Sequence, residues 1–195
     1  MARKAKVVRK TTETDISLEI DLDRSTGGKI DTTIPFFNHM LELFARHGGF
    51  KLTVGGRGDT EVDDHHLVED LGICLGKALG QALGDKRGIN RYGSASVPMD
   101  ESLCRVDADI SGRPYLVYNV EHERRKIGEF EPALVKEFFK AFTDHSGVTL
   151  HINLVYGDNS HHIIEAVFKA FARALREAVT INPENKGVLS TKGTL

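Results

Sequence analysis

The two halves of the chain repeat one pattern, and this internal duplication constrains the fold more than any other feature of the sequence. Residues 35–49 and 133–147 space their apolar positions in the same way, and both close with His-x-Gly. In each half, a stretch of alternating apolar and polar residues and then a turn follow, and both halves continue into the same motif, His-His-x-x-Glu. Such a repeat indicates two copies of one structural unit that bury their apolar faces together. We therefore expect an α+β fold made of two ββαβα-type halves.

The boundary between the copies is expected between Gly88 and Gly93, where turn residues interrupt the pattern. The first repeat then covers residues 1–92, and the second covers residues 93–182. Residues 183–195 are rich in Gly, Lys, Ser and Thr and are expected to form a C-terminal loop. We expect the copies to share one interface and to form one compact unit.

Periodicity predicts the elements of each half. Alternation over residues 6–23, with Val8 and Ile16 in phase, is typical of a half-buried strand. In the rest of the first half, a helix is expected to start at Pro35 and to stop at Gly48-Gly49, followed by a strand over 50–54 and a glycine turn at 55–58. A second helix, capped by Asp63 or Asp64, is expected to end at Gly84. The second half is expected to contain strands over 94–97, 102–110 and 115–120, a helix from Pro132 to about 146, a strand over 148–155, and a helix over 161–179.

Composition and charge exclude several classes of function. The formal net charge of -2 provides no overall positive field, so nucleic-acid binding through phosphate neutralisation is not expected. Cys74 and Cys104 stand alone in apolar surroundings, which is typical of buried, reduced thiols. The basic N-terminus is not followed by an apolar run, and no segment approaches the roughly 18 apolar residues of a membrane span. We expect a cytoplasmic protein that does not bind membranes.

The duplicated motif has the geometry of a metal-ligand set. It comprises His65, His66 and Glu69 in the first half and His161, His162 and Glu165 in the second. On a helix, the glutamate lies one turn after the histidines, so a carboxylate and an imidazole share one face. Adjacent histidines point about 100° apart, so each is expected to serve a different ion. Imidazole and carboxylate without thiolate suit Mn, Zn, Fe or Ni.

A simpler interpretation of one His-His pair is a solvated helix start, but its duplication favours a metal role because packing does not require these polar residues. His39 and His47 lie about two turns apart on the first predicted helix, and His39 is a candidate for a further ligand. In the second half, Glu137 matches His39 by helix position, and His145 matches His47. His122 and His151 are interpreted as surface or packing residues.

Residues that could bind an anion are dispersed along the chain. They are Arg91, Arg113, Lys169, and the tail segment 190–193 with Ser190 and Lys192. A phosphate is best bound by charge-assisted donors from several directions. The neighbouring carboxylates Asp100 and Glu101 are either catalytic or part of a turn between strands.

Six segments together resemble the imidazoleglycerol-phosphate dehydratase family along nearly the whole chain. They are residues 36–41, 63–70, 88–93, 109–115, 157–169 and 190–193. The resemblance implies a duplicated fold similar to domain 2 of ribosomal protein S5. It also implies a large cage-like homo-oligomer of 24 subunits, with active sites at subunit contacts.

The same resemblance implies two Mn ions in each active site. One ion would be bound by His39, His66, His161 and Glu165, and the other by His65, Glu69 and His162. The family often supplies one more histidine to the second ion. The matching position here is Glu137, and whether Glu137 or His145 completes that site is left open.

The implied reaction is the dehydration of imidazoleglycerol phosphate to imidazole acetol phosphate in histidine biosynthesis, with the ring bound as imidazolate between two cations. By resemblance, Glu13 contacts the substrate and acts as an acid or base, and Glu165 is the second catalytic candidate. His39 and His47 would also contact the substrate. The phosphate would be bound by Arg91, Arg113, Lys169, Ser190 and Lys192 from more than one subunit.

Two other functions are compatible with the motif. The same ligands could serve a dinuclear metallohydrolase that acts on phosphate esters. Alternatively, the histidines could only cross-link subunits in a metal-dependent assembly protein.

Overall fold

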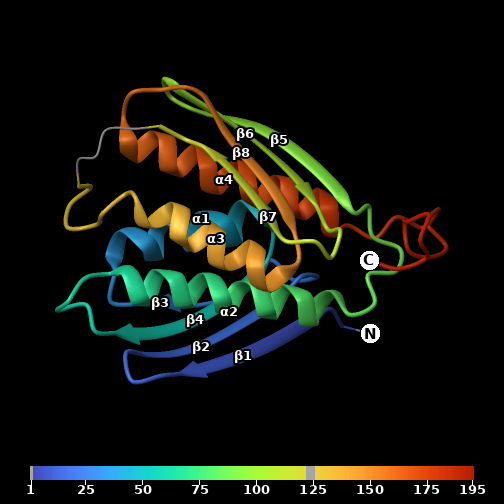
Figure 1. The fold of residues 1–195 in the computed structure, drawn as a ribbon, viewed down its shortest axis with the longest axis horizontal. Helices are drawn as coiled ribbons and strands as arrows, with labels where there is room; N and C mark the ends of the chain where they lie inside the picture. Colours follow the sequence, from blue (N-terminus) through green and yellow to red (C-terminus); the bar gives the residue numbers. More distant parts are fainter. Residues whose placement is uncertain (1, 122–125) are drawn as a thin grey trace.

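A computed structural model describes residues 2–121 and 126–195 and shows two four-stranded sheets with four helices between them (Figure 1). The first half contains β1 (Lys4–Lys10), β2 (Thr14–Asp21), β3 (Ile30–Asp31), α1 (Pro35–Gly48), β4 (Lys51–Gly58) and α2 (His65–Leu83). The second half contains β5 (Tyr92–Met99), β6 (Ser102–Asp109), β7 (Tyr115–Asn119), α3 (Leu134–Ser146), β8 (Thr149–Tyr156) and α4 (Ser160–Val179). The prediction of a duplicated α+β fold is confirmed, with the short strand β3 as an addition.

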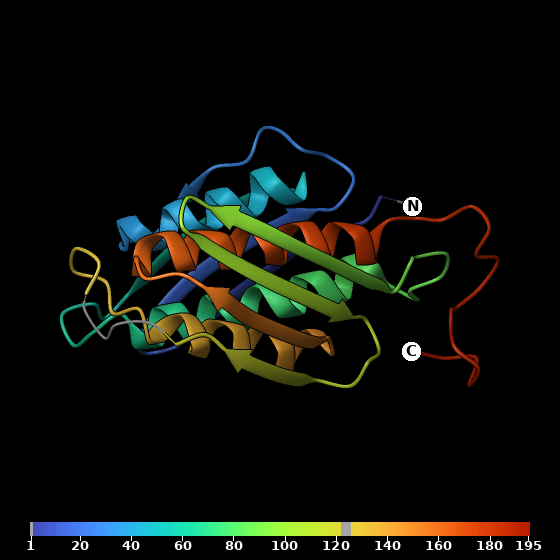
Figure 2. The same cartoon turned by 90° about the horizontal axis from the view of Figure 1, so that it is seen from above.

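Both sheets have the same topology. Their strand orders are β1-β2-β4-β3 and β5-β6-β8-β7. The first three strands of each sheet are antiparallel, whereas β3 pairs in parallel with β4, and β7 with β8. The last helix of each half packs on its own sheet, α2 on β1 and β2, and α4 on β5 and β6 (Figures 1 and 2).

Helices from opposite halves pack against each other in the middle layer. α1 of the first half lies against α4, and α3 of the second half lies against α2. The ring of Phe37 on α1 contacts Phe138 on α3 and Phe168 on α4, with centroid distances of 5.1 and 5.9 Å. All three rings are fully buried. One hydrophobic core therefore includes side chains from both copies.

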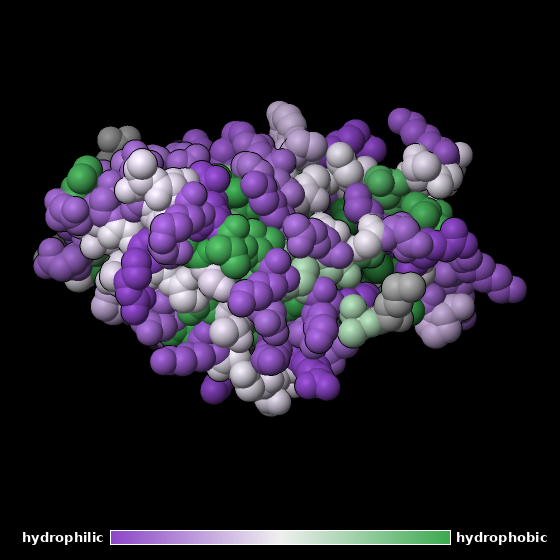
Figure 3. Space-filling view, turned by 90° about the horizontal axis from the view of Figure 1, so that it is seen from below, coloured by the Kyte–Doolittle hydropathy of each residue, from purple (hydrophilic) through white to green (hydrophobic). Residues whose placement is uncertain are grey.

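The alternating segment 6–23 is a hairpin rather than the single strand expected. The chain reverses after Lys10, which pairs with Asp15, so the phase of burial changes between β1 and β2. As a result Val7 is buried and Val8 is 66% exposed, whereas Ile16 on β2 is fully buried. The outer face of this sheet is largely hydrophilic, as Figure 3 shows.

The prediction of a glycine turn at 55–58 is also wrong, because these residues continue strand β4. Gly58 pairs with Thr14, and Gly56 pairs with Ile16. A Cβ atom on Gly58 would lie 2.9 Å from the Cβ of Leu67. Glycine is needed here because the first turn of α2 packs closely on the strand, and the actual turn follows at 59–64.

The helix ends agree with the expected signals more closely than the helix starts. Gly49 and Gly147 terminate α1 and α3 with φ angles of 62° and 70°. Asn159 caps α4 by accepting hydrogen bonds from the backbone N–H groups of His161 and His162. Of the two candidates for capping α2, Asp64 makes no side-chain cap bond, whereas Asp63 Oδ1 accepts a hydrogen bond from the backbone N–H of His65 at 2.7 Å.

Both His-His-x-x-Glu motifs occupy the first turns of their helices, α2 and α4. Figure 1 shows these two helix starts at one end of the molecule and the C-terminal loop at the other. Among the described residues, no helix has the length and apolar character needed to cross a bilayer.

Two glycines on α2 provide a test of the helix packing. A Cβ atom on Gly72 would lie 2.4 Å from the carbonyl oxygen of Phe138 on α3, whereas one on Gly80 would meet no atom within 4 Å. We expect Gly72→Ala to lower the free energy of unfolding by roughly 1–3 kcal/mol through overpacking. Gly80→Ala should raise it by up to about 1 kcal/mol. Urea denaturation of both variants measures the difference, and equal effects would contradict the close approach of α2 and α3.

Candidate functional site

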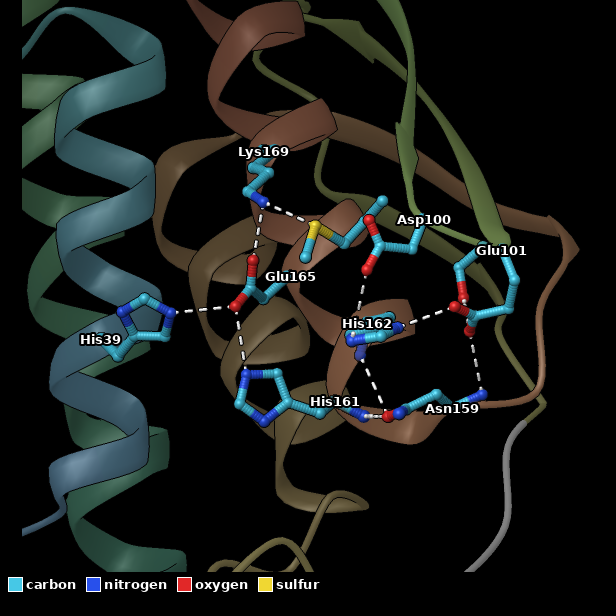
Figure 4. Close-up of polar contacts among 10 residues, drawn as sticks. His39, Asp100, Glu101, Asn159, His161, His162, Glu165 and Lys169 are labelled. Carbon is cyan, nitrogen blue, oxygen red and sulfur yellow. Dashed lines mark hydrogen bonds and ion pairs between the residues drawn. The ribbon is translucent and has the colours of Figure 1, made fainter.

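Three potential metal ligands converge where α1 packs against α4. His39 on α1 and His161 on α4 direct their Nε2 atoms to Oε1 of Glu165, at 3.0 and 3.1 Å (Figure 4). One ligand atom from each of these residues lies within 4.8 Å of the others. Among residues 2–121 and 126–195, this is the one group of three or more such ligands found. We refer to it as the His-Glu cluster.

Glu165 is held as a carboxylate. Burial raises its pKa, but the hydrogen bonds from Lys169, His39 and His161 outweigh this effect and lower the pKa to about 2. Lys169 Nζ lies 2.6 Å from Oε2 and also contacts Met99 Sδ at 3.1 Å. Both carboxylate oxygens of Glu165 therefore have partners, and Lys169 lies beside this carboxylate in the folded chain.

The chemistry of the His-Glu cluster fits a divalent transition-metal ion. Two imidazole nitrogens and a carboxylate oxygen are the donors that Mn, Zn, Fe and Ni accept. The buried and ionised Glu165 supplies negative charge, and the side chains of His39 and His161 remain partly exposed, so an ion could reach them.

His162 points away from this cluster, as the alternation of adjacent histidines predicts. Its Nδ1 lies 2.7 Å from Oε2 of Glu101. The other oxygen of Glu101, Oε1, accepts from Ser102 Oγ and from the backbone N–H of Asn159. The hydrogen bond raises the pKa of His162 and lowers that of Glu101 to about 2. A carboxylate on one ring nitrogen fixes the ring orientation and leaves the other nitrogen to bind an ion.

The first repeat has a parallel arrangement. Nδ1 of His66 lies 3.0 Å from Oδ2 of Asp59, and this hydrogen bond raises the pKa of His66. On the other side of the ring, Nε2 of His66 is 4.0 Å from Oε1 of Glu13. Nε2 of His65 is 3.8 Å from Oε2 of Glu69, so these two residues share a helix face as expected.

A single chain brings together only part of each expected ligand set. Of the set for the first ion, His39, His161 and Glu165 converge, whereas His66 contacts Asp59 instead. His65, Glu69 and His162, expected at the second ion, do not form a three-ligand group within the described chain.

The other expected or weighed histidines lie outside the cluster. His47 is exposed in the last turn of α1, where partial burial and the nearby Lys169 and Arg173 lower its pKa. His145 Nδ1 donates to the carbonyl of Ala141 at 2.9 Å, and Glu137 is half-buried in the first turn of α3. His122 lies outside the described residues. His151 is exposed on β8.

Four of the five expected phosphate-binding residues line one groove at the opposite end of the molecule. This groove, of about 770 Å³, includes Arg91, Arg113, Ser190 and Lys192. Arg91 is fixed by Asp109, which accepts from Nε at 2.7 Å, and by the carbonyl of Leu189 at 2.7 Å. Arg113 is 63% exposed, and its guanidinium makes long contacts with the carbonyl of Ser111 at 3.4 Å and with Asp109 Oδ2 at 3.9 Å. We call this feature the basic groove.

The His-Glu cluster and the basic groove lie far apart in one chain. The backbone N–H of Arg91 donates to the carbonyl of Ala178 near the end of α4, and Glu165 lies near the start of the same helix. At 1.5 Å per helical residue, the stretch from Glu165 to Ala178 is about 20 Å long.

Asp59 and Glu101 bind histidines in the structure, although no local pattern in the sequence indicated either residue as a histidine partner. Glu101 was weighed only as a turn or catalytic residue, and it is in fact a turn residue that binds His162. The available signal was the duplication itself. Glu13 and Glu101 occupy the same position in the first hairpin of each repeat, because Thr11 pairs with Thr14 as Met99 pairs with Ser102.

Comparisons with known proteins point to one enzyme family. Residues 32–175 match the family model of imidazoleglycerol-phosphate dehydratase. The enzyme of this name from Syntrophus aciditrophicus is 66% identical over 99% of this chain and 98% of its own length. The one from Geobacter metallireducens is 57% identical over the full length of both.

Solved structures show the same fold. The imidazoleglycerol-phosphate dehydratase from Staphylococcus aureus matches with a TM-score of 0.84 and 42% identity, over 92% of this chain and 99% of that one. The Pyrococcus furiosus enzyme in complex with (S)-C348 matches with a TM-score of 0.85 and 39% identity, over 97% of this chain and 100% of that one.

The duplicated fold and these matches place the protein among the hydro-lyases, enzymes that remove water from their substrates. The chain belongs to the imidazoleglycerol-phosphate dehydratase family, and it is therefore a dehydratase of histidine biosynthesis.

Substitution of two histidines on α1 tests whether Mn binds specifically at the His-Glu cluster or to exposed histidines in general. His39 belongs to the His-Glu cluster, whereas His47 lies two turns further along the helix. We expect His39→Ala to weaken Mn binding by at least about tenfold, because it removes one of three converging donors. His47→Ala should leave the affinity within about twofold. Calorimetric titration of chelator-stripped protein measures both, and equal losses would contradict the assignment.

Proposed function

We propose that the protein converts imidazoleglycerol phosphate to imidazole acetol phosphate with two Mn ions in each active site. The convergence of His39, His161 and Glu165 carries this proposal, because these residues could together hold a divalent ion in a chain of the dehydratase family. The ions would hold the imidazole ring of the substrate as its anion and stabilise the charge that develops on the ring.

The duplicated motif, together with His39 on α1, would supply the ligands of both ions. One ion would be bound by His39, His66, His161 and Glu165, and the other by His65, Glu69 and His162, with Glu137 or His145 as the candidate for completing the second set. The hydrogen bonds of His66 and His162 support this division. Both rings engage a carboxylate through Nδ1. Nε2 of His66 lies 4.0 Å from Glu13 and Nε2 of His162 lies 3.8 Å from Asp100, both beyond hydrogen-bond distance, so each Nε2 could bind an ion.

Dehydration requires that a proton leave one carbon and a hydroxyl leave the neighbouring carbon as water. The proton is not adjacent to a carbonyl group, so the ring must accept the electron density that an enolate would otherwise hold. A positioned acid or base must move the proton. Glu13 is the better placed of the two candidates, because its side chain is 53% exposed beside His66. Glu165 already accepts hydrogen bonds at both oxygens.

The phosphate of the substrate would lie in the basic groove. Arg91, Arg113, Ser190 and Lys192 would donate hydrogen bonds to it, and residues 183–195 would thereby contribute to the active site. Lys169 lies beside Glu165, and His47 lies near Lys169, so both would approach the same substrate from the subunit that supplies the His-Glu cluster.

The separation of the two sites supports an active site shared between chains. An imidazole ring, three carbons and a phosphate extend over roughly 10 Å at ordinary bond lengths. This length does not bridge the roughly 20 Å along α4 between the His-Glu cluster and the basic groove of one chain. We propose that a cage of 24 subunits brings the cluster of one chain to the groove of another. A cytoplasmic location remains a prediction.

Product formation tests the proposed reaction directly. Chelator-treated protein should convert little imidazoleglycerol phosphate, and addition of Mn should restore formation of imidazole acetol phosphate. The ketone product and inorganic phosphate are quantified in the same samples. Absence of the ketone in metal-loaded protein would contradict the proposal, and release of inorganic phosphate would instead indicate a metallohydrolase.

Arg113→Ala tests the basic groove and the assembly-protein alternative together. Loss of one charge-assisted hydrogen bond to phosphate should lower kcat/KM by roughly ten- to a hundredfold, mainly through KM. The oligomer should keep its size. Arg105→Ala is the matched control, because Arg105 is an exposed arginine that pairs with Asp107 outside the groove. An unchanged KM in Arg113→Ala would contradict the proposed phosphate site.

A further inference from the structure

A buried carboxylate outside the metal and phosphate residues joins α2 to the β1–β2 hairpin. Asp70 directly follows Glu69 and is 7% exposed. Its Oδ2 accepts a hydrogen bond from Thr14 Oγ1, and its Oδ1 lies 2.8 Å from Nε of Arg9. Both partners belong to the hairpin, so Asp70 ties the turn between β1 and β2 to the helix that carries the first His-His-x-x-Glu motif.

The turn held in this way carries Glu13. The backbone N–H groups of Glu13 and Thr14 donate to Thr11 Oγ1 at 3.1 and 2.9 Å. The carbonyl of Glu13 accepts from the backbone N–H of Asp59 at 3.1 Å. The backbone of the turn is therefore fixed on both sides, whereas the side chain of Glu13 forms no hydrogen bond within its own turn and extends towards His66.

The second repeat builds the equivalent hairpin on α4 without a carboxylate at the position of Asp70. By repeat position Ser102 corresponds to Thr14, and the fully buried Ala166 corresponds to Asp70. There the turn glutamate itself is anchored, since Glu101 binds His162 and the N–H of Asn159. The fold thus does not need a carboxylate at this position. Asp70 is found in the repeat whose turn glutamate, Glu13, has no hydrogen bond like that of Glu101 to His162.

Stability alone does not account for Asp70. A buried ion pair is often no more stabilising than apolar side chains of the same volume, because both charges lose their hydration. A hydrogen-bonded carboxylate does, however, fix the relative position of two elements better than apolar contact does. A reactive group displaced by about 1 Å can cost a hundredfold in rate, so such fixing has a direct consequence for catalysis.

We propose that Asp70, acting through Thr14, is a positioning residue that holds the Glu13 turn at the distance from α2 required for proton transfer. This inference rests on the proposed role of Glu13. Asp70 itself contacts neither the substrate nor the ions. It sets the place of Glu13 relative to His66 on the adjoining helix.

Thr14→Val tests the inference, because it removes the hydroxyl donor and keeps the shape of the side chain. We expect kcat to fall by roughly ten- to a hundredfold, with KM, Mn content and oligomer size unchanged. Thr14→Ser restores the hydroxyl and should restore kcat to within about threefold of the unmodified protein. Thr143→Val is the matched control, because Thr143 is equally buried and bonds only within α3.

A double-mutant cycle separates positioning from a general loss of stability. If Thr14 acts through Glu13, Thr14→Val should cause no further loss of kcat in a Glu13→Gln background. Additive losses would overturn the inference while leaving the role of Glu13 intact. If Glu13→Gln itself leaves kcat unchanged, the proposed role of Glu13 fails, and the inference fails with it.

Hydrogen exchange supplies a readout that does not depend on turnover. In Asp70→Asn, the amides of residues 11–14 should exchange faster, whereas those of the second hairpin, at residues 99–102, should not change. Unchanged exchange in the first hairpin would show that Asp70 does not hold the turn and would overturn the inference.

Discussion

The contact between α1 and α4 is the interaction on which the rest of the site depends. Phe44 on α1 of the first repeat stacks on Phe171 on α4 of the second, with a centroid distance of 5.1 Å. The same contact brings His39 to Glu165. Neither repeat could build the His-Glu cluster alone, so the shared hydrophobic core is also what creates the candidate metal site.

The two copies retain one architecture and differ in how they use it. Each hairpin turn presents a glutamate to the second histidine of the adjacent motif. In the second repeat Glu101 is bonded to that histidine, and in the first repeat Asp59 takes this place, which leaves Glu13 free. After the duplication, the two histidines came to bind different carboxylates. The turn with Glu101 therefore has a structural role, and the turn with Glu13 has a candidate catalytic role.

Signals that act over a few residues could be predicted from the sequence, and those that depend on packing between distant elements could not. The glycines that end α1 and α3, and the place of both motifs in a first helical turn, follow from local rules. Strand β4 continues through Gly58 because Leu67 packs against it, which no local pattern indicates. The same holds for Asp59, whose role depends on how the loop before α2 folds back onto His66.

In the proposed assembly, the His-Glu cluster of one chain and the basic groove of another serve the same substrate. Co-expression of His39→Ala chains with Arg113→Ala chains tests it most directly, because each variant alone lacks one part of every site. Random assembly should restore about a quarter of the unmodified activity, since half of the clusters and half of the grooves remain intact independently. Activity no higher than that of the two separate variants would show that one chain supplies both parts and would exclude a site shared between chains.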